Sequence, residues 1–225
     1  MKYLFSSSVT VFLLFSAIVF AQSSKSKEGK SLFGDLTARQ IGPALMSGRI
    51  NDLEIHPTNN KILYLGAAGG GVWKSNDGGA TFNPIFDEHI QSIGTVTLDP
   101  NDPDNTIYVG TGETWTRNSV SYGDGLYKST DGGSNWNKIG LENSERIASI
   151  IVNPSNSQEV YVAALGALWG DNEERGVFKS SDGGQTWEKI LYVNPKTGCA
   201  DLIMDPNNPS ILYASMWEFR RTAWS

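Results

Sequence analysis

Several residue types are scarce in this chain, and each scarcity excludes a class of protein. Its 225 residues include one cysteine and two histidines, which excludes an internal disulfide and disfavours a histidine-rich metal centre. Lys and Arg number 18 against 24 Asp and Glu, and the formal net charge of -6 argues against a nucleic-acid partner. No apolar run reaches the roughly 18 residues of a membrane-spanning helix. We therefore expect no metal, no cofactor, no nucleic-acid partner and no membrane span.

Glycine and aromatic residues, by contrast, are plentiful. The chain has 24 Gly, 7 Trp, 8 Tyr and 9 Phe, with 39% hydrophobic and 19% charged residues. This composition is that of a folded protein and not of a disordered one, and it favours strands and turns over helices. The sequence therefore predicts an all-β protein.

The first residues have the features of a targeting segment. Residues 1–21 combine an early Lys2 with an apolar stretch and end at Ala21, which predicts a signal peptide. Residues 22–34 are rich in Ser and Lys and are expected to form a flexible tether. We therefore expect export to the periplasm, the cell surface or the medium.

An internal repeat is the strongest signal in the sequence. Three similar octapeptides, SNDGGATF, STDGGSNW and SSDGGQTW, begin at Ser75, Ser129 and Ser180. A second series of turns contains Pro57, Pro100, Pro154 and Pro206, each between two strand-like segments. Self-similarity at roughly 50 residues with strand patterns inside each unit is typical of a β-propeller, in which every repeat is one four-stranded antiparallel blade. Blades are expected to start near residues 49, 92, 146 and 199 of a propeller domain at 35–225.

The third unit gives the strand assignment and the place of the octapeptide. Strands are predicted at 146–152, 159–165, 176–180 and 186–191, so the octapeptide lies in the hairpin between the third and fourth strands. Its Ser and Asp can hold the turn, its paired Gly permit positive φ, and its final aromatic ring packs against the hairpin. Because the motif recurs in every unit, we interpret its residues as structural and not catalytic. These are Ser75, Asp77, Gly79, Ser129, Asp131, Gly133, Trp136, Ser180, Asp182, Gly184 and Trp187.

The octapeptides resemble the Asp-box, also called the bacterial neuraminidase repeat or BNR. Together with the Asp-Pro-Asn turns and the segment from Ile41 to Arg49, they make residues 36–225 similar to exported bacterial proteins related to the sortilin N-terminal domain and to sialidase-like glycosyl hydrolases. The resemblance implies a propeller. It does not by itself imply an activity, because receptors, hydrolases and assembly factors share this fold.

Longer loops between the second and third strands of two units point to a ligand face. These loops combine aromatic rings with charges, which suits recognition of a carbohydrate, peptide or protein. The alternative is that the Trp rings cover the blade ends and pack there. The candidate binding residues are Arg49, Glu113, Trp115, Arg117, Tyr122, Trp169, Asp171, Trp217 and Arg220.

Catalytic residues of the related enzymes are mostly missing from the pattern. Arg49 matches an arginine of sialidases, but Asn51 replaces the proline of their motif. The resemblance to xyloglucanase-type propellers around residues 64–74 implies that their catalytic Asp falls at Ala68, which cannot transfer a proton. Glu113 and Asp171 are the loop carboxylates to test. The sequence therefore favours a noncatalytic binding or scaffold module, with part of a sialidase-like or xyloglucanase-like glycoside hydrolase as the alternative.

The repeat count predicts an open ring. About three and a half blades fit into the chain, whereas propellers have four to eight. Residues 36–41 resemble an outer strand and are expected to close the ring with a last blade. The segment 212–216 is expected to form an open strand edge. These features lead us to expect a fragment of a longer protein, with further C-terminal blades completing the ring.

Overall fold

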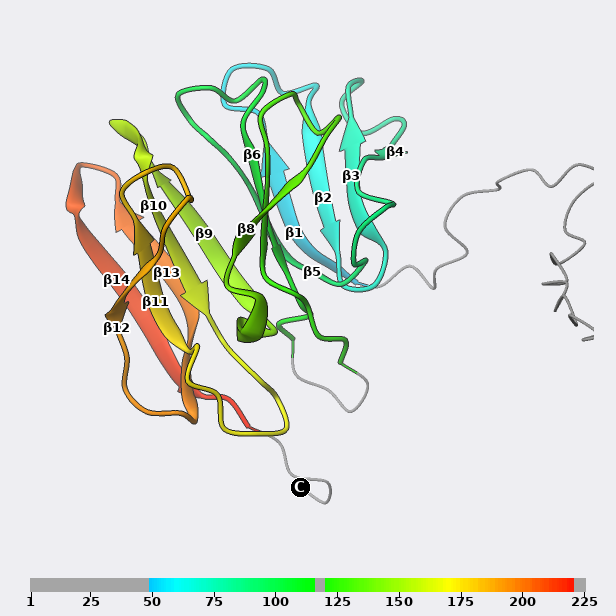
Figure 1. The fold of residues 1–225 in the computed structure, drawn as a ribbon. Coiled ribbons are helices and arrows are strands. Elements are labelled where there is room, and N and C mark those ends of the chain that lie inside the picture. Colours follow the sequence, from blue (N-terminus) through cyan, green and yellow to red (C-terminus); the bar gives the residue numbers. More distant parts are fainter. Residues whose placement is uncertain (1–48, 116–119, 221–225) are drawn as a thin grey trace, which may run out of the picture. The chain divides into compact units, whose positions relative to one another are not determined.

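The computed structural model describes residues 49–115 and 120–220 (Figure 1). The predicted signal peptide, the tether and the strand at 36–41 lie outside these residues, as does Arg117. Within the part described, the single helical element is a 3-10 turn at Glu142–Ser144, and no helix is long and apolar enough to cross a membrane. The rest is strands and turns, which confirms the all-β prediction.

Fourteen strands form four antiparallel sheets. The first three sheets have four strands each, joined in sequence order, and the last has two. The strands of the first sheet are β1 (Ile50–Ile55), β2 (Leu63–Ala67), β3 (Gly71–Ser75) and β4 (Asn83–Pro84). Those of the second are β5 (Ile93–Leu98), β6 (Ile107–Thr111), β7 (Leu126–Ser129) and β8 (Asn137–Gly140). Those of the third are β9 (Ile147–Asn153), β10 (Asn156–Ala164), β11 (Gly176–Ser180) and β12 (Glu188–Leu191). The last sheet pairs β13 (Thr197–Asp205) with β14 (Asn208–Glu218).

Each sheet is one blade, and we number the blades 1 to 4 in chain order. The first strand of every blade lies next to the first strand of the following blade, so β1, β5, β9 and β13 form the inner row (Figure 1). This arrangement of repeated antiparallel meanders is that of an incomplete propeller, as predicted. The expected strand limits of blade 3 differ from β9, β10 and β12 by up to three residues, because its hairpin pairing extends to Asn153 and Asn156 at the turn.

The hydrophobic core lies between the blades. One cluster joins blades 1 and 2 around Tyr64, Ile93 and Val96, and another joins blades 2 and 3 around Tyr108 and Ile150. A third cluster joins Tyr161 and Val177 of blade 3 to Leu202 of blade 4. Since strand side chains alternate between the two faces of a sheet, each blade contributes one face to the cluster before it and one to the cluster after it. Blade packing is therefore the main source of stability.

The octapeptides form the same hydrogen-bonded hairpin three times. In blade 3, the Ser180 hydroxyl donates to Asp182 Oδ1 over 2.7 Å and accepts the N–H of Gly184 over 2.8 Å. Asp182 also accepts the main-chain N–H and the hydroxyl of Thr186. The equivalent hydrogen bonds hold the pKa of Asp77 and Asp131 down to about 2, with the side chains of Thr81 and Asn135 as the largest causes. The ionised carboxylate is thus part of each turn.

The octapeptide tryptophans bridge neighbouring blades, which the sequence did not predict. Trp136 Nε1 of blade 2 donates to Ile85 O of blade 1 over 2.8 Å. Trp187 Nε1 of blade 3 donates in the same way to Ile139 O of blade 2 over 2.7 Å. In the opposite direction, Lys128 Nζ of blade 2 donates to Gly183 O of blade 3 over 2.9 Å. The expected packing of the ring against its own hairpin is therefore only part of its role.

Candidate functional site

The long loops emerge at one end of the molecule, opposite the octapeptide hairpins (Figure 1). They follow β6 and β10 and carry the exposed Trp115 and Trp169, and Trp217 is exposed within the last residues of β14. Tyr122, in the loop after β6, is also exposed. The reading in which these rings are buried as blade covers does not fit their exposure.

A groove of about 360 Å³ opens among the inner strands at this end. Its lining includes Trp115, Trp217 and the polar side chains of Asp52, Thr95 and Ser149. These three polar residues come from successive inner strands and each follows the same β-bulge, which disturbs the pairing of the strand with its neighbour. Because the bulge recurs at the same place in each inner strand, the residue after it has the same position in every blade. Asp201 of β13, also in the groove, holds the fourth equivalent position.

Sequence reasoning missed this polar row. The signal was present, because the four inner strands can be aligned on their following Pro turns. Asp52, Thr95, Ser149 and Asp201 then fall at one position of the repeat and are all polar. The loops drew attention instead because their length varies.

Two ion pairs hold charged residues of the loops after β6 and β10. Arg49 donates to Glu113, and Arg220 Nη1 donates to Asp171 Oδ1 over 2.6 Å. Glu113 is buried and also accepts the N–H of Ser121 over 3.3 Å, whereas Asp171 and Arg220 stay partly exposed. The nine predicted binding residues therefore divide into four exposed rings, two charge pairs and Arg117, which lies outside the described residues. Glu113 does not present an open carboxylate to solvent, contrary to the expectation for a loop residue.

Ala68, the position implied for the catalytic Asp of xyloglucanases, is close to the first ion pair in the structure. Its N–H donates to Arg49 O over 2.8 Å, and Arg49 in turn binds Glu113 through its side chain. Ala68 is buried. The carboxylate of Glu113 is thus linked through one residue to the backbone of Ala68.

Two buried arginines support the same end. Arg175 donates from its guanidinium to the carbonyls of Leu165 and Ala167, and its Nε donates to Pro195 O over 2.7 Å. Arg146 donates from Nη1 to Glu145 over 3.0 Å. Burial lowers the pKa of both side chains from the ordinary arginine value. Through these bonds Arg175 fixes the loop after β10.

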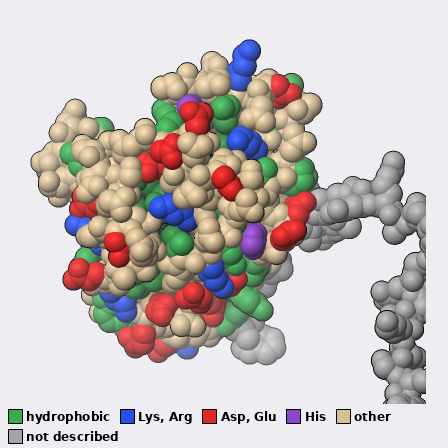
Figure 2. Space-filling model, turned by 45° about the horizontal axis from the view of Figure 1, so that its top comes forward, with side chains coloured by type: hydrophobic (Ala, Val, Ile, Leu, Met, Phe, Trp, Pro, Cys, Tyr) green, Lys and Arg blue, Asp and Glu red, His purple; other side chains and the backbone are tan. Residues whose placement is uncertain are grey.

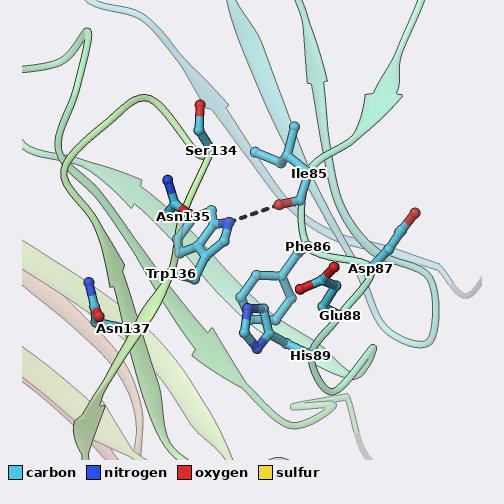
Figure 3. A pocket seen from close by; sticks show the side chains of 9 residues that line it. All are labelled: Ile85, Phe86, Asp87, Glu88, His89, Ser134, Asn135, Trp136 and Asn137. Carbon is cyan, nitrogen blue, oxygen red and sulfur yellow. Dashed lines mark hydrogen bonds between the residues drawn. The ribbon is translucent and has the colours of Figure 1, made fainter.

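A second cavity, of about 290 Å³, lies at the outer edge between blades 1 and 2 (Figure 3). Its wall is formed by Phe86 with the rings of His89 and Trp136 packed beside it. Asp87 and Glu88 are at its mouth and are exposed. The dashed line in Figure 3 is the bond from Trp136 to Ile85, so this cavity is a by-product of the blade junction.

Surface charge on the visible face is mixed. Figure 2 shows acidic side chains interspersed with basic ones and with apolar patches, and no continuous basic area is seen on that face of the described residues. A phosphate backbone would require such an area.

Comparison with known proteins gives the context of the site. The chain is 29% identical over 200 residues to an oligoxyloglucan-reducing end-specific xyloglucanase of Emericella nidulans, a match that covers 79% of this chain and 23% of that protein. It is 24% identical over 243 residues to the xyloglucanase Xgh74A of Acetivibrio thermocellus, covering 70% of this chain and 28% of that protein. Both relatives are xyloglucanases. The chain spans about a quarter of their length, and no family model matches it.

Solved structures support the fold. An ancestral GH74 enzyme superposes with a TM-score of 0.58 at 22% identity, over 77% of this chain and 23% of that one. The propeller prediction is confirmed, whereas the assignment to the sortilin-type branch finds no support in these comparisons.

The expectation of a noncatalytic binding or scaffold module is wrong. Its basis was the absence of catalytic acids at the positions that resemblance implied, above all Ala68. The relatives are glycoside hydrolases of several times this chain's length, so a site need not be complete within these residues. The comparisons support the alternative, the hydrolase reading.

Proposed function

We propose that this chain is part of a xyloglucanase-like glycoside hydrolase, and that its long-loop end binds the glucan backbone of the substrate. The similarity to xyloglucanases over most of the chain carries the proposal. The exposed rings support it, because flat aromatic faces pack against the apolar faces of sugar rings while nearby polar groups orient the hydroxyls.

The groove combines aromatic and polar side chains, as a sugar-binding surface requires. Trp115 and Trp217 line the groove together with the carboxylate of Asp52 and the hydroxyls of Thr95 and Ser149. Such groups pair with sugar hydroxyls, and the rings supply apolar area without net charge. A neutral polysaccharide fits this face better than an anionic ligand does.

Hydrolysis of a glycosidic bond requires two carboxyl groups at a defined separation. Glu113 and Asp171 are our candidates within the described residues. Asp171 is partly exposed beside Arg220, so its carboxylate is accessible from solvent. Glu113 is buried and bound to Arg49, so it is suited to positioning. With Ala68 in place of the expected Asp, we place at least one catalytic acid in blades outside this segment of the polypeptide.

The remaining assignments complete the proposal. Residues 1–21 would direct export, residues 22–34 would form a tether, and the propeller would occupy residues 35–225. An exported enzyme has direct access to plant polysaccharide.

The test is reducing-sugar release from xyloglucan by the complete gene product. We expect hydrolysis by the wild type and a large loss in kcat for Asp171→Asn with an unchanged melting temperature. Glu188→Gln, on the exposed strand β12, is the matched control. No release from xyloglucan or from other β-glucans by a folded wild type would refute the hydrolase. Full activity of Asp171→Asn would remove that residue from the catalytic role.

A further inference from the structure

A third cavity, of about 430 Å³, lies at the long-loop end between blade 1 and the loop after β6. Its lining comes from Gly69 in the β2–β3 turn, from residues 90–92 before β5 and from residues 120–122 of the loop. None of these side chains is charged. The volume is within the range of about 300 to 1,000 Å³ that small-ligand sites have. We call this cavity the side pocket.

The loop residues of the side pocket are held by contacts on two sides. The Ser121 carbonyl accepts the main-chain N–H of Glu113 over 3.0 Å and the hydroxyl of Ser92 over 3.1 Å. The Ser121 N–H donates to Glu113 Oε2 over 3.3 Å. Val120 packs against the apolar cluster around Leu168, in the loop after β10. The side pocket is therefore formed before a ligand binds, and binding does not have to order these residues.

The lining of the side pocket suits a neutral ligand with both apolar and polar surface. Gln91 is fixed, because its Nε2 donates to Phe86 O over 2.9 Å and to His89 O over 2.7 Å. Tyr122 is 65% exposed, so its ring is accessible, and Ser121 beside it is exposed as well. A sugar ring has an apolar face for the tyrosine and hydroxyls for the polar groups. A charged ligand would meet no opposite charge among the side chains that line the pocket.

The side pocket is a neighbour of the groove. Ser92 lines the side pocket, and Gly94 and Thr95, which follow it in the chain, line the groove. Likewise, Trp115 lines the groove and Tyr122 the side pocket, and both belong to the connection between β6 and β7. A polymer bound in the groove can therefore reach the side pocket with a short branch.

We propose that the side pocket binds one uncharged sugar unit, carried as a branch by the glucan in the groove, with the Tyr122 ring packed against it. Xyloglucan is a glucan that carries xylose branches, so the groove would hold its backbone and the side pocket a branch. The inference rests on the proposed function, because it needs a glucan in the groove. It adds that the protein discriminates branched from unbranched glucans, and it assigns this discrimination to Tyr122.

Calorimetric titration of the chain with two oligosaccharides tests the side pocket. One is a xyloglucan oligosaccharide, and the other is the cello-oligosaccharide with the same backbone and no branches. The wild type should bind the branched ligand more tightly. Tyr122→Ala should weaken binding of the branched ligand by about tenfold more than binding of the unbranched one. Because Tyr122 is exposed, the melting temperature of this variant should match that of the wild type.

Two control variants should keep the preference for the branched ligand. Tyr122→Phe retains the ring, and Glu188→Gln changes an exposed residue of β12. Equal affinity of the wild type for the two ligands, or an equal loss for both in Tyr122→Ala, would overturn the side pocket while a glucan site in the groove still stood. Binding of neither ligand by the folded wild type would overturn the glucan site and the side pocket together.

Discussion

Glu54 is an acid whose ionisation opposes folding. Burial between blades 1 and 2 raises its pKa from 4.5 to about 7, with the nearby charge of Asp52 adding to the rise and the bond from the Leu98 N–H opposing it. The folded state therefore holds a proton that the unfolded chain releases. Stability from this group is complete below the unfolded pKa of 4.5 and is lost as the pH rises toward 7.

The substitution Glu54→Gln should remove this dependence. Its free energy of unfolding, measured by urea titration, is expected to decline less than that of the wild type between pH 4.5 and 7. Glu188→Gln should retain the wild-type slope. If wild type and Glu54→Gln lost stability in parallel over this range, the buried carboxyl would not be the cause.

Asp77 and Asp131 act in the opposite direction. Their pKa is lowered, so their contribution is present above the ordinary value of 3.8 and is lost as the pH falls toward 2. The turn carboxylates and Glu54 therefore change stability with pH in opposite directions.

Trp187 of blade 3 packs against the core between blades 2 and 3 and donates a hydrogen bond to blade 2. Trp187→Ala removes both its packing against the core of that junction and the bond to Ile139 O. Trp-to-Ala substitutions in cores cost about 3 to 5 kcal/mol, and because Trp187 is half-buried we expect about 3 kcal/mol in urea unfolding. Trp187→Phe keeps the ring and should cost less. An unchanged unfolding midpoint for Trp187→Ala would contradict the bridging role.

At the scale of elements, the loop after β10 combines a hydrogen-bonded base with an exposed ring. Arg175 fixes the loop after β10 by binding its carbonyls, while Trp169 stays exposed. The exposed ring can therefore be removed without unfolding the loop. This separation makes the binding role of the rings testable.

Trp115→Ala and Trp169→Ala should weaken binding of xyloglucan oligosaccharides while leaving the melting curve in place. Affinity electrophoresis in xyloglucan gels measures the first and thermal unfolding the second. Ile190→Ala, which removes an exposed apolar side chain from the outer strand β12, should alter neither. A melting temperature lowered together with binding would instead assign these rings to packing.

Sequence patterns predicted the elements better than their contacts. The octapeptide hairpins follow from local chemistry, since Ser180, Asp182 and Gly184 interact within five residues. The bridging role of Trp187 depends on a neighbour about 50 positions away, which periodicity cannot supply. Glu113 shows the same limit, because its ion-pair partner Arg49 lies 64 positions away in another blade. Loop length pointed to one end of the molecule but did not separate exposed rings from buried charges.

At the scale of the whole molecule, the inner and outer ends of each blade are tied to the next by different bonds. Asp52 binds Thr95 near the inner row, and Lys128 and Trp187 exchange bonds between blades 2 and 3 near the outer edge. Every tie is between adjacent repeats. Stability should then behave as a sum of blade terms and nearest-neighbour terms.

Hydrogen exchange of the 225-residue chain should reveal this order. Amides of β5–β7 and β9–β11, which have blades on both sides, are expected to exchange most slowly. Amides of β1 and β14, at the two open sides, should exchange faster and respond first to urea. Uniform exchange across the four inner strands would contradict a nearest-neighbour description.

The tyrosine series has a consequence for how such a ring can be monitored. Four tyrosines occupy the same strand position of the repeat: Tyr64, Tyr108, Tyr161 and Tyr213. The first three are buried between blades, whereas Tyr213 is exposed. Because all four share one strand position, their environments differ chiefly in what covers them. A tyrosine-specific spectroscopic label at position 213 would therefore report any molecule that covers this face of β14, with the other three tyrosines as buried references.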